Sequence, residues 1–332
     1  MLSTEDFELE RLAPDHYRLR WPQAAEPRVS TIRVSLGAEQ PPLDCAVALD
    51  DGVAELRGLV PAPRHFFHIA FADGRTLLLA ERRLALRGTP NFRDFGGYTT
   101  DSGRRVRWGQ LFRSGQLDLV DDADQAAIAA LDISLICDFR HDVERERAPN
   151  RFAQAHRPRV ENLSIMPGSV ANVFAQIGTS GGTSAQQMAQ LMVEINRDLA
   201  SQQRATYQRL FELLAEHDGP LLIHCAAGKD RTGFGAALIL AALDVPEPVL
   251  LHDYLLTDRY LPIEADLQRI REKYELDVPD AVLRPMLEVR REYLHGALEM
   301  AKSEFGSLAG YLRDGLGVNA AMRAELQRRL LE

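Results

Sequence analysis

The sequence predicts an α/β protein, in which a domain with a central, mostly parallel sheet flanked by helices follows a small all-β sandwich. Residues 1–87 contain short β-type runs broken by turn residues. Residues 88–332 alternate short apolar runs with longer helical patterns. Within this second part, residues 220–243 have the pattern of a buried strand, a loop of small residues and an Ala-rich helix. We therefore place a domain boundary between residues 87 and 88.

The composition is that of a globular protein without a nucleic-acid partner. The 332 residues are enough for two domains, and 45% of them are hydrophobic and 26% charged. The net charge of −9 would repel nucleic acid, anionic membranes and phosphorylated molecules alike. Any bound phosphate must therefore be held by a local cluster of donors. No stretch has the length and apolarity of a membrane span.

The cysteines and the N-terminus predict a cytoplasmic protein. Three cysteines do not form a disulfide framework, which indicates a reducing compartment. The N-terminus lacks the apolar core of a signal peptide, and export by a route without such a signal stays open.

The first domain is expected to be a β-sandwich of six or seven strands. Its alternating apolar patterns lie at residues 17–21, 31–36, 46–49, 65–71 and 75–80. We expect Trp21, Phe67 and Ile69 to lie in its core rather than to form a ligand platform. The run from Gly58 to Phe66, with Trp21 upstream, resembles a fibronectin type III module. The sequence identifies no partner for this domain.

The second domain begins with β-type segments and a short helix. Residues 105–108 and 133–137 read as strands, and residues 124–131 read as a helix capped by Asp121 or Asp122. Asp138 and Arg140 come just after the second strand, where open α/β sheets bind ligands. They are expected either to contact a substrate phosphate or to form a buried ion pair that braces a neighbouring loop.

Helical patterns occupy most of the remaining chain. They lie at residues 169–177, 185–200, 203–216, 248–259, 263–274, 282–301 and 320–331. The apolar stripe from Met188 to Leu199 predicts a core face rather than a substrate surface. The Gly- and Ser-rich run 178–184 makes residues 165–200 a candidate helical lid. No chemistry is expected from the C-terminal helices.

The loop after the strand at residues 221–223 combines Cys225 with Arg231. A strand, a tight loop and a helix N-terminus direct successive amides, here those of Ala226, Ala227 and Gly228, at one spot. These groups would hold a phosphate, and they also stabilise a thiolate. Arg231 offers a planar fork for two phosphate oxygens. The pattern predicts a nucleophile and an anion site in one loop, with a structural turn around a buried cysteine as the alternative.

The full string from His224 to Gly233 resembles the active-site loop of the Cys-dependent protein tyrosine phosphatases. Further motifs follow in the order of the atypical bacterial tyrosine and phosphoinositide phosphatases: Asn91–Tyr98, Phe112–Leu117, Asp138–Arg140 with Glu144 and Arg145, Asp253–Asp258, and Glu304–Ser307 with Tyr311 and Leu312. The resemblance covers residues 88–331. It implies hydrolysis of phosphotyrosine with broad specificity, including phosphoinositides or phosphoserine and phosphothreonine, without a metal or cofactor.

The chemistry of such an enzyme assigns a role to each residue of the loop. Cys225 would attack phosphorus to give a cysteinyl-phosphate, and Arg231 with the loop amides would hold the equatorial oxygens. Thr232 would donate its hydroxyl to the sulfur, cap the helix, or do both. His224 would shape the loop through backbone contacts.

The resemblance implies that Asp230 is the general acid, with Asp138 and Asp142 as alternatives. Its cationic neighbours would favour the carboxylate over the acid, which argues against easy proton donation. Arg93, Asp94 and Arg113 are expected to support the site.

The roles of Lys229, in the loop, and of Cys137, on a neighbouring strand, stay open. Lys229 resembles the lysine with which inositol-lipid phosphatases hold a further phosphate, and a solvated lysine is the alternative. Cys137 could form a protective disulfide with Cys225, or it could be a core residue. The competing functions are a dedicated phosphoinositide or inositol-phosphate phosphatase, a phosphate-binding module without turnover, and a rhodanese-type sulfur transferase.

Overall fold

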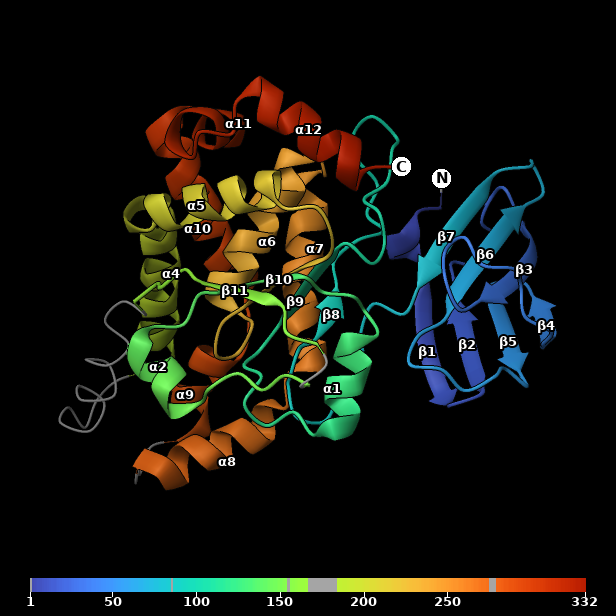
Figure 1. The fold of residues 1–332 in the computed structure, drawn as a ribbon, viewed down its shortest axis with the longest axis horizontal. Helices are drawn as coiled ribbons and strands as arrows, with labels where there is room; N and C mark the ends of the chain where they lie inside the picture. Colours follow the sequence, from blue (N-terminus) through green and yellow to red (C-terminus); the bar gives the residue numbers. More distant parts are fainter. Residues whose placement is uncertain (1, 85, 154–155, 167–183, 275–278) are drawn as a thin grey trace.

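The structure consists of a small all-β part, blue in Figure 1, beside a larger α/β part. It is a computed structural model that describes residues 2–84, 86–153, 156–166, 184–274 and 279–332. None of the described helices is long and apolar enough to cross a membrane.

The all-β part is a sandwich of two antiparallel sheets after a 3-10 helix, η1 (Thr4–Asp6). Its strands are β1 (Glu8–Ala13), β2 (His16–Arg20), β3 (Val29–Ser35), β4 (Ala46–Asp50), β5 (Val53–Arg57), β6 (Phe66–Phe71) and β7 (Thr76–Ala80). The orders β1-β2-β5-β4 and β3-β6-β7 are those of a constant-type immunoglobulin sandwich. The fibronectin type III resemblance stays a prediction. Trp21, Phe67 and Ile69 lie in the core between the sheets, which confirms their predicted place.

The larger part contains one mixed sheet, ordered β11-β10-β12-β9-β8. Its strands are β8 (Arg93–Asp94), β9 (Leu111–Ser114), β10 (Leu135–Asp138), β11 (Arg159–Asn162) and β12 (Leu221–His224). The first four strands of that order run parallel and β8 is antiparallel, so the sheet is mostly parallel as predicted. Two local predictions were wrong. Residues 105–108 form only isolated bridges because they pair with single residues at 99 and 331, and Asp138 ends β10 rather than following it.

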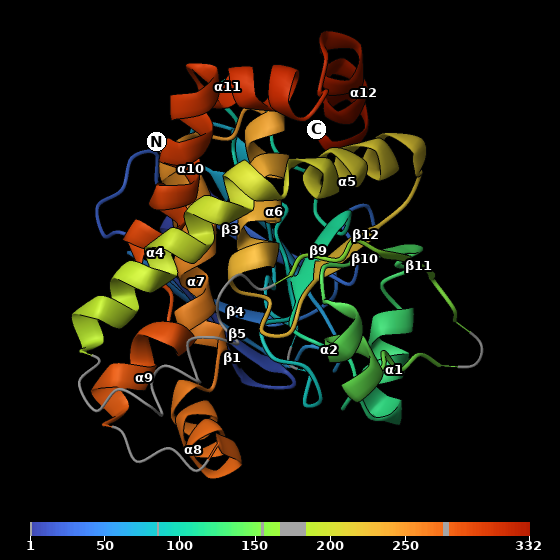
Figure 2. The same cartoon turned by 90° about the vertical axis from the view of Figure 1, so that its left-hand side faces the viewer.

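Both faces of this sheet are covered because side chains alternate along each strand. Leu111, Leu135 and Ile223 face a large cluster with helices from residues 185–331. Phe112 and Leu222 face the opposite cluster, which includes Ile128 of the short helix α1 (Asp122–Ala129). Figure 2 shows α6 (Asp230–Ala242) beside the central strands, with α4 (Ala185–Gln202) and α10 (Arg291–Phe305) next to it. This packing places β12, and the loop that follows it, in the middle of the domain.

The described helices mostly lie where the apolar periodicity predicts them. They are α1 (Asp122–Ala129), α2 (Asp142–Arg147), α4 (Ala185–Gln202), α5 (Arg204–Glu216), α6 (Asp230–Ala242), α7 (Glu247–Tyr260), α8 (Ile263–Tyr274), α9 (Asp280–Leu287), α10 (Arg291–Phe305), α11 (Leu308–Gly310), the π-helix η2 (Tyr311–Gly315) and α12 (Ala320–Leu330). The single helix predicted at residues 282–301 was wrong, because the chain breaks between α9 and α10. The predicted helix at 169–177 and residues 167–183 of the candidate lid lie outside the described residues.

Candidate active site

The loop between β12 and α6 lies at the carboxyl end of the parallel strands, where α/β sheets hold ligands. Gly228 has a φ of +66°, and a Cβ built there would lie 2.4 Å from the carbonyl oxygen of Ser114 at the end of β9. Only glycine combines this left-handed backbone with so close an approach. The loop is therefore seated directly on the neighbouring strand.

The carbonyl groups of the loop are held by donors on its outer side. The carbonyl of His224 accepts from the Phe139 amide at 2.9 Å, and that of Ala226 accepts from the Gln116 amide at 2.9 Å. The carbonyl of Gly228 accepts from Asn91 Nδ2 at 2.8 Å and from Arg113 Nη2 at 2.9 Å. Asn91 lies in the motif Asn91–Tyr98, but the sequence alone predicted no role for it.

Cys225 is 3% exposed and lines a cavity of about 490 Å³. Ala226, Ala227, Lys229, Asp230 and Arg231 also line it. The rest of the lining is mostly apolar. Its apolar members are Met166, Met192, Ile195, Leu199, Met286 and Leu287, and its polar members are Glu144, Asp198, Gln202 and Gln203. The predicted stripe on α4 is thus buried, as expected of a core face, and part of it also forms the cavity wall.

Arg231 forms a two-point ion pair with a glutamate. Its Nη1 and Nη2 lie 2.7 and 2.9 Å from the two carboxylate oxygens of Glu144 on α2. Burial opposes the charge of Arg231, but Glu144 raises its pKa above the usual value, so the side chain stays cationic. Glu144 belongs to the motif Asp138–Arg140 with Glu144 and Arg145, but the sequence alone did not predict this role. Glu144 fixes the plane in which the guanidinium meets the cavity.

Asp230 is held by two neutral donors and faces a cation. Its Oδ1 accepts from the Tyr254 hydroxyl at 3.1 Å and from Asn196 Nδ2 at 3.3 Å. Its Oδ2 lies 3.4 Å from Lys229 Nζ, and its side chain is 19% exposed. Both donors come from helices that are distant in the sequence. Tyr254 lies within the motif Asp253–Asp258, whereas no sequence pattern singled out Asn196.

Lys229 is buried, so its reading as a solvated lysine was wrong. Its Nζ donates to the carbonyls of Met286 at 2.5 Å and Glu288 at 3.1 Å, where the chain breaks between α9 and α10. The ammonium is therefore bound to the protein backbone rather than presented to a second phosphate.

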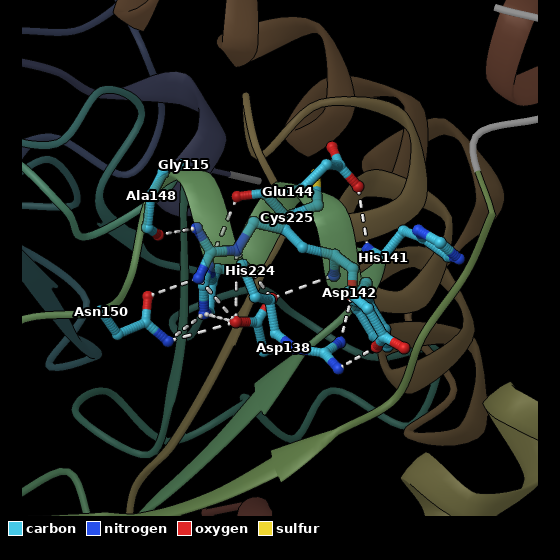
Figure 3. Close-up of polar contacts among 12 residues, drawn as sticks. Gly115, Asp138, His141, Asp142, Glu144, Ala148, Asn150, His224 and Cys225 are labelled. Atoms are coloured by element: carbon cyan, nitrogen blue, oxygen red, sulfur yellow. Dashed lines mark hydrogen bonds and ion pairs between the residues drawn. The ribbon is translucent and has the colours of Figure 1, made fainter. Parts of the chain in front are cut away.

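Asp138 and Arg140 lie behind the loop rather than in the cavity. Both are fully buried, and Arg140 binds Asp138 through Nε and Nη2 and the Ala148 carbonyl through Nη1. Asp138 Oδ2 also lies 3.4 Å from His224 Nε2 (Figure 3). The geometry matches the bracing ion pair, and the alternative expectation, that these residues contact a substrate phosphate, was wrong.

The two alternative acids, Asp138 and Asp142, are not placed to donate a proton to a leaving group. Burial alone would raise the pKa of Asp138, but His224 and Arg140 hold it far below its usual value, so the group stays ionised. Asp142 pairs with Arg145 at the start of α2, where two thirds of its side chain is exposed.

Thr232 is buried within the first turn of α6. The N-cap position belongs to Lys229, so the reading of Thr232 as the cap was wrong. Its hydroxyl has no hydrogen-bond partner among the residues that the structure describes. His224 places Nδ1 3.3 Å from the Cys225 carbonyl, in agreement with a shaping role.

The three residues expected to support the site divide into two groups. Arg93 and Arg113 meet at Asp253 on α7, with Arg113 Nη1 2.6 Å from its Oδ2. Asp94 instead binds Arg64 of the sandwich at 2.6 Å, so its predicted support of the loop was wrong.

Cys137 has the environment of a core residue. It lies on β10 opposite Ile223 of β12, both Cys137 and Cys225 are free thiols, and burial raises the pKa of Cys137 to about 12. An inert, protonated thiol follows from this burial.

Comparisons with known proteins identify the family of this chain. The model of the "Tyrosine phosphatase family" matches residues 84–332. A Cupriavidus necator protein named among the tyrosine-protein phosphatases is 35% identical over 238 residues, covering 72% of this chain and 85% of its own. The "Triple specificity protein phosphatase PtpB" of Mycobacterium tuberculosis is 31% identical over 267 residues, covering 71% and 94%.

A solved structure gives a weaker likeness. That of P. aeruginosa TpbA aligns with 60% of this chain and 90% of its own at 18% identity, and its TM-score of 0.25 is too low to support an argument. The family match and the sequence relatives suffice: the chain belongs to the tyrosine phosphatase family.

Proposed function

We propose that this chain hydrolyses phosphotyrosine through a cysteinyl-phosphate intermediate, with a specificity broad enough to include phosphoserine and phosphothreonine or phosphoinositides. The observation that carries the proposal is the loop itself. It brings Cys225 and Arg231 to one cavity while donors outside the loop hold its carbonyls. A thiolate, a cation and a set of amides then face the same bound ester.

In the first step the Cys225 thiolate attacks phosphorus. A P–S bond forms, the ester P–O bond breaks, and the leaving oxygen takes a proton from Asp230. Arg231, oriented by Glu144, and the loop amides bind the equatorial oxygens, where charge must be stabilised in the transition state.

In the second step water replaces the cysteine. Its oxygen bonds to phosphorus, the P–S bond breaks, and the Asp230 carboxylate takes a proton from the water. The unpaired Thr232 hydroxyl is available to donate a hydrogen bond to the departing sulfur. Phosphate leaves, and the thiolate and the acid are restored.

The cavity wall favours an aromatic substrate within this range. Met192, Ile195 and Met286 offer apolar contact to a phenyl ring whose phosphate reaches Cys225. Lys229, which a polyphosphorylated inositol would need as a free cation, is bound to backbone carbonyls. Both features support phosphotyrosine over a dedicated phosphoinositide substrate.

The test is turnover of p-nitrophenyl phosphate, followed by a panel of phosphopeptides and phosphoinositides. We expect vanadate-sensitive hydrolysis that Cys225→Ser abolishes. The matched control is Cys45→Ser, which replaces a half-buried cysteine of the sandwich and should keep wild-type activity. Full activity in Cys225→Ser, or no turnover of any ester by the wild-type protein, would contradict the proposal.

A further inference from the structure

We propose that Asn91 and Arg113, oriented by Asp253, are positioning residues that aim the loop amides at the substrate phosphate. The inference rests on the proposed function and extends it to side chains that never touch substrate. The side chains that bind the outer side of the loop are the evidence for it.

Two side chains bind three successive carbonyls of the loop. Asn91 Nδ2 lies 2.8 Å from the Gly228 carbonyl and 3.4 Å from that of Ala227. Arg113 Nη2 lies 2.9 Å from the Gly228 carbonyl and 3.4 Å from that of Lys229. These donors come from the strand end of β9 and the segment before β8, on the side away from the cavity.

The direction of the amides follows from peptide geometry. In a planar trans peptide the C=O and the next N–H point in opposite directions. Holding the carbonyls of residues 227–229 outward therefore directs the amides of residues 228–230 inward. Fixed amides that need no reorientation during the reaction are the most effective stabilisers of charge in a transition state.

Asp253 fixes both donors. Its Oδ2 binds Arg113 Nη1 at 2.6 Å, and its Oδ1 lies 3.3 Å from Arg93 Nε. Arg93 Nη1 in turn donates to Asn91 Oδ1, which sets the amide of Asn91 so that Nδ2 faces the loop. The arginines and the aspartate are at most 2% exposed, so their geometry is shielded from water.

The cluster also carries charge. Two arginines and one carboxylate leave a buried net positive charge behind the loop. Burial and the neighbouring Arg93 lower the pKa of Arg113 to about 10, while Asp253 and Cys225 oppose that change. Arg113 is therefore cationic at neutral pH, so the side of the loop that faces away from the cavity carries a positive charge.

The test compares Asn91→Gly, Arg113→Lys and Asp253→Asn with wild type. Asn91 has a φ of +61°, so glycine removes the donor without backbone strain. For each variant we would measure kcat and KM for p-nitrophenyl phosphate, the vanadate dissociation constant by calorimetry, and the melting temperature. Loss of one oxyanion donor in other enzymes costs about 100-fold or more in kcat, so we expect at least about tenfold for an indirect effect, with vanadate binding weakened in parallel.

Asp124→Asn is the matched control, because Asp124 is a buried aspartate that accepts from the amides of Arg87 and Gly88. It should lose stability but keep kcat and vanadate affinity. The proposal is overturned if Asn91→Gly and Asp253→Asn fold and retain wild-type kcat and vanadate affinity. Vanadate binding needs no turnover, so a wild-type protein that binds vanadate without hydrolysis would refute the proposed function alone.

Discussion

The Asp230 carboxylate shares its cavity with the nucleophile and is the only candidate acid among Asp138, Asp142 and Asp230 that does so. Without it, the leaving oxygen would depart as an anion. Asp230→Asn should therefore slow phenyl phosphate, whose leaving group is poor, by about 100-fold or more, and p-nitrophenyl phosphate much less. The slope of log kcat against leaving-group pKa measures this directly. Asp142→Asn should leave the slope unchanged, and equal losses on both esters would remove Asp230 as the acid.

Lys229 provides a second prediction about a single side chain. Because its Nζ is bound to the carbonyls of Met286 and Glu288, its loss should loosen the cavity wall for every substrate alike. Lys229→Met should lower turnover of a phosphotyrosine peptide and of a phosphoinositide by the same factor. The ratio of the two kcat/KM values is the measurement. A selective loss of the phosphoinositide would restore the role of a second-phosphate ligand.

Among the elements, the strand, loop and helix at residues 221–242 could be predicted from sequence because their signals are local. The break between α9 and α10 could not be predicted from the sequence. The apolar periodicity continues through it, while its partners lie elsewhere in the chain: Asp258 accepts from the Val289 amide at 2.8 Å, and Lys229 binds the Met286 carbonyl. Glu144, Asn91 and Asp253 escaped assignment for the same reason, since each contacts the loop or its supports across a long stretch of chain.

The residue before strand β6 makes a pH-dependent contribution to stability. His65, which precedes it, is fully buried, with Nδ1 2.9 Å from the Tyr17 hydroxyl and Nε2 3.0 Å from the Val60 carbonyl. Burial lowers the pKa of His65 below its usual value. Unfolding therefore takes up a proton below a pH of about 6.5, so the stability from neutral His65 is present above that pH and lost as pH falls.

The comparison variant is His65→Gln, which keeps a donor for Val60 but does not titrate. Between about pH 7.5 and about pH 5.5, the unfolding free energy should fall more for wild type than for the variant. Chemical denaturation at each pH gives both values. Parallel pH curves would show that protonation of His65 does not contribute.

For the molecule as a whole, the sandwich packs against the α/β part and contributes none of the described residues that line the cavity at Cys225. Trp108 donates its indole N–H to the Leu78 carbonyl at 3.1 Å and packs on Phe66 and Ala80. Gly97 has a φ of +79°, and a Cβ there would lie 2.1 Å from the Trp108 ring. The residues that line the cavity at Cys225 all lie between positions 144 and 287. The observed role of the sandwich is therefore packing against the α/β part.

Trp108 and Trp21 allow this docking to be separated from sandwich stability, because both are 8% exposed but only Trp108 lies at the junction. Truncation of a buried Trp costs about 3–5 kcal/mol of unfolding free energy, so both alanine variants should be destabilised. Only Trp108→Ala should also free the two domains from each other, because it removes the shared cluster while each core stays intact. Limited proteolysis should then cut Trp108→Ala between residues 80 and 90 well before global unfolding, while Trp21→Ala is cut within the sandwich. Equal resistance of that segment in wild type and Trp108→Ala would mean that other junction contacts, such as Arg64 with Asp94, hold the domains together on their own.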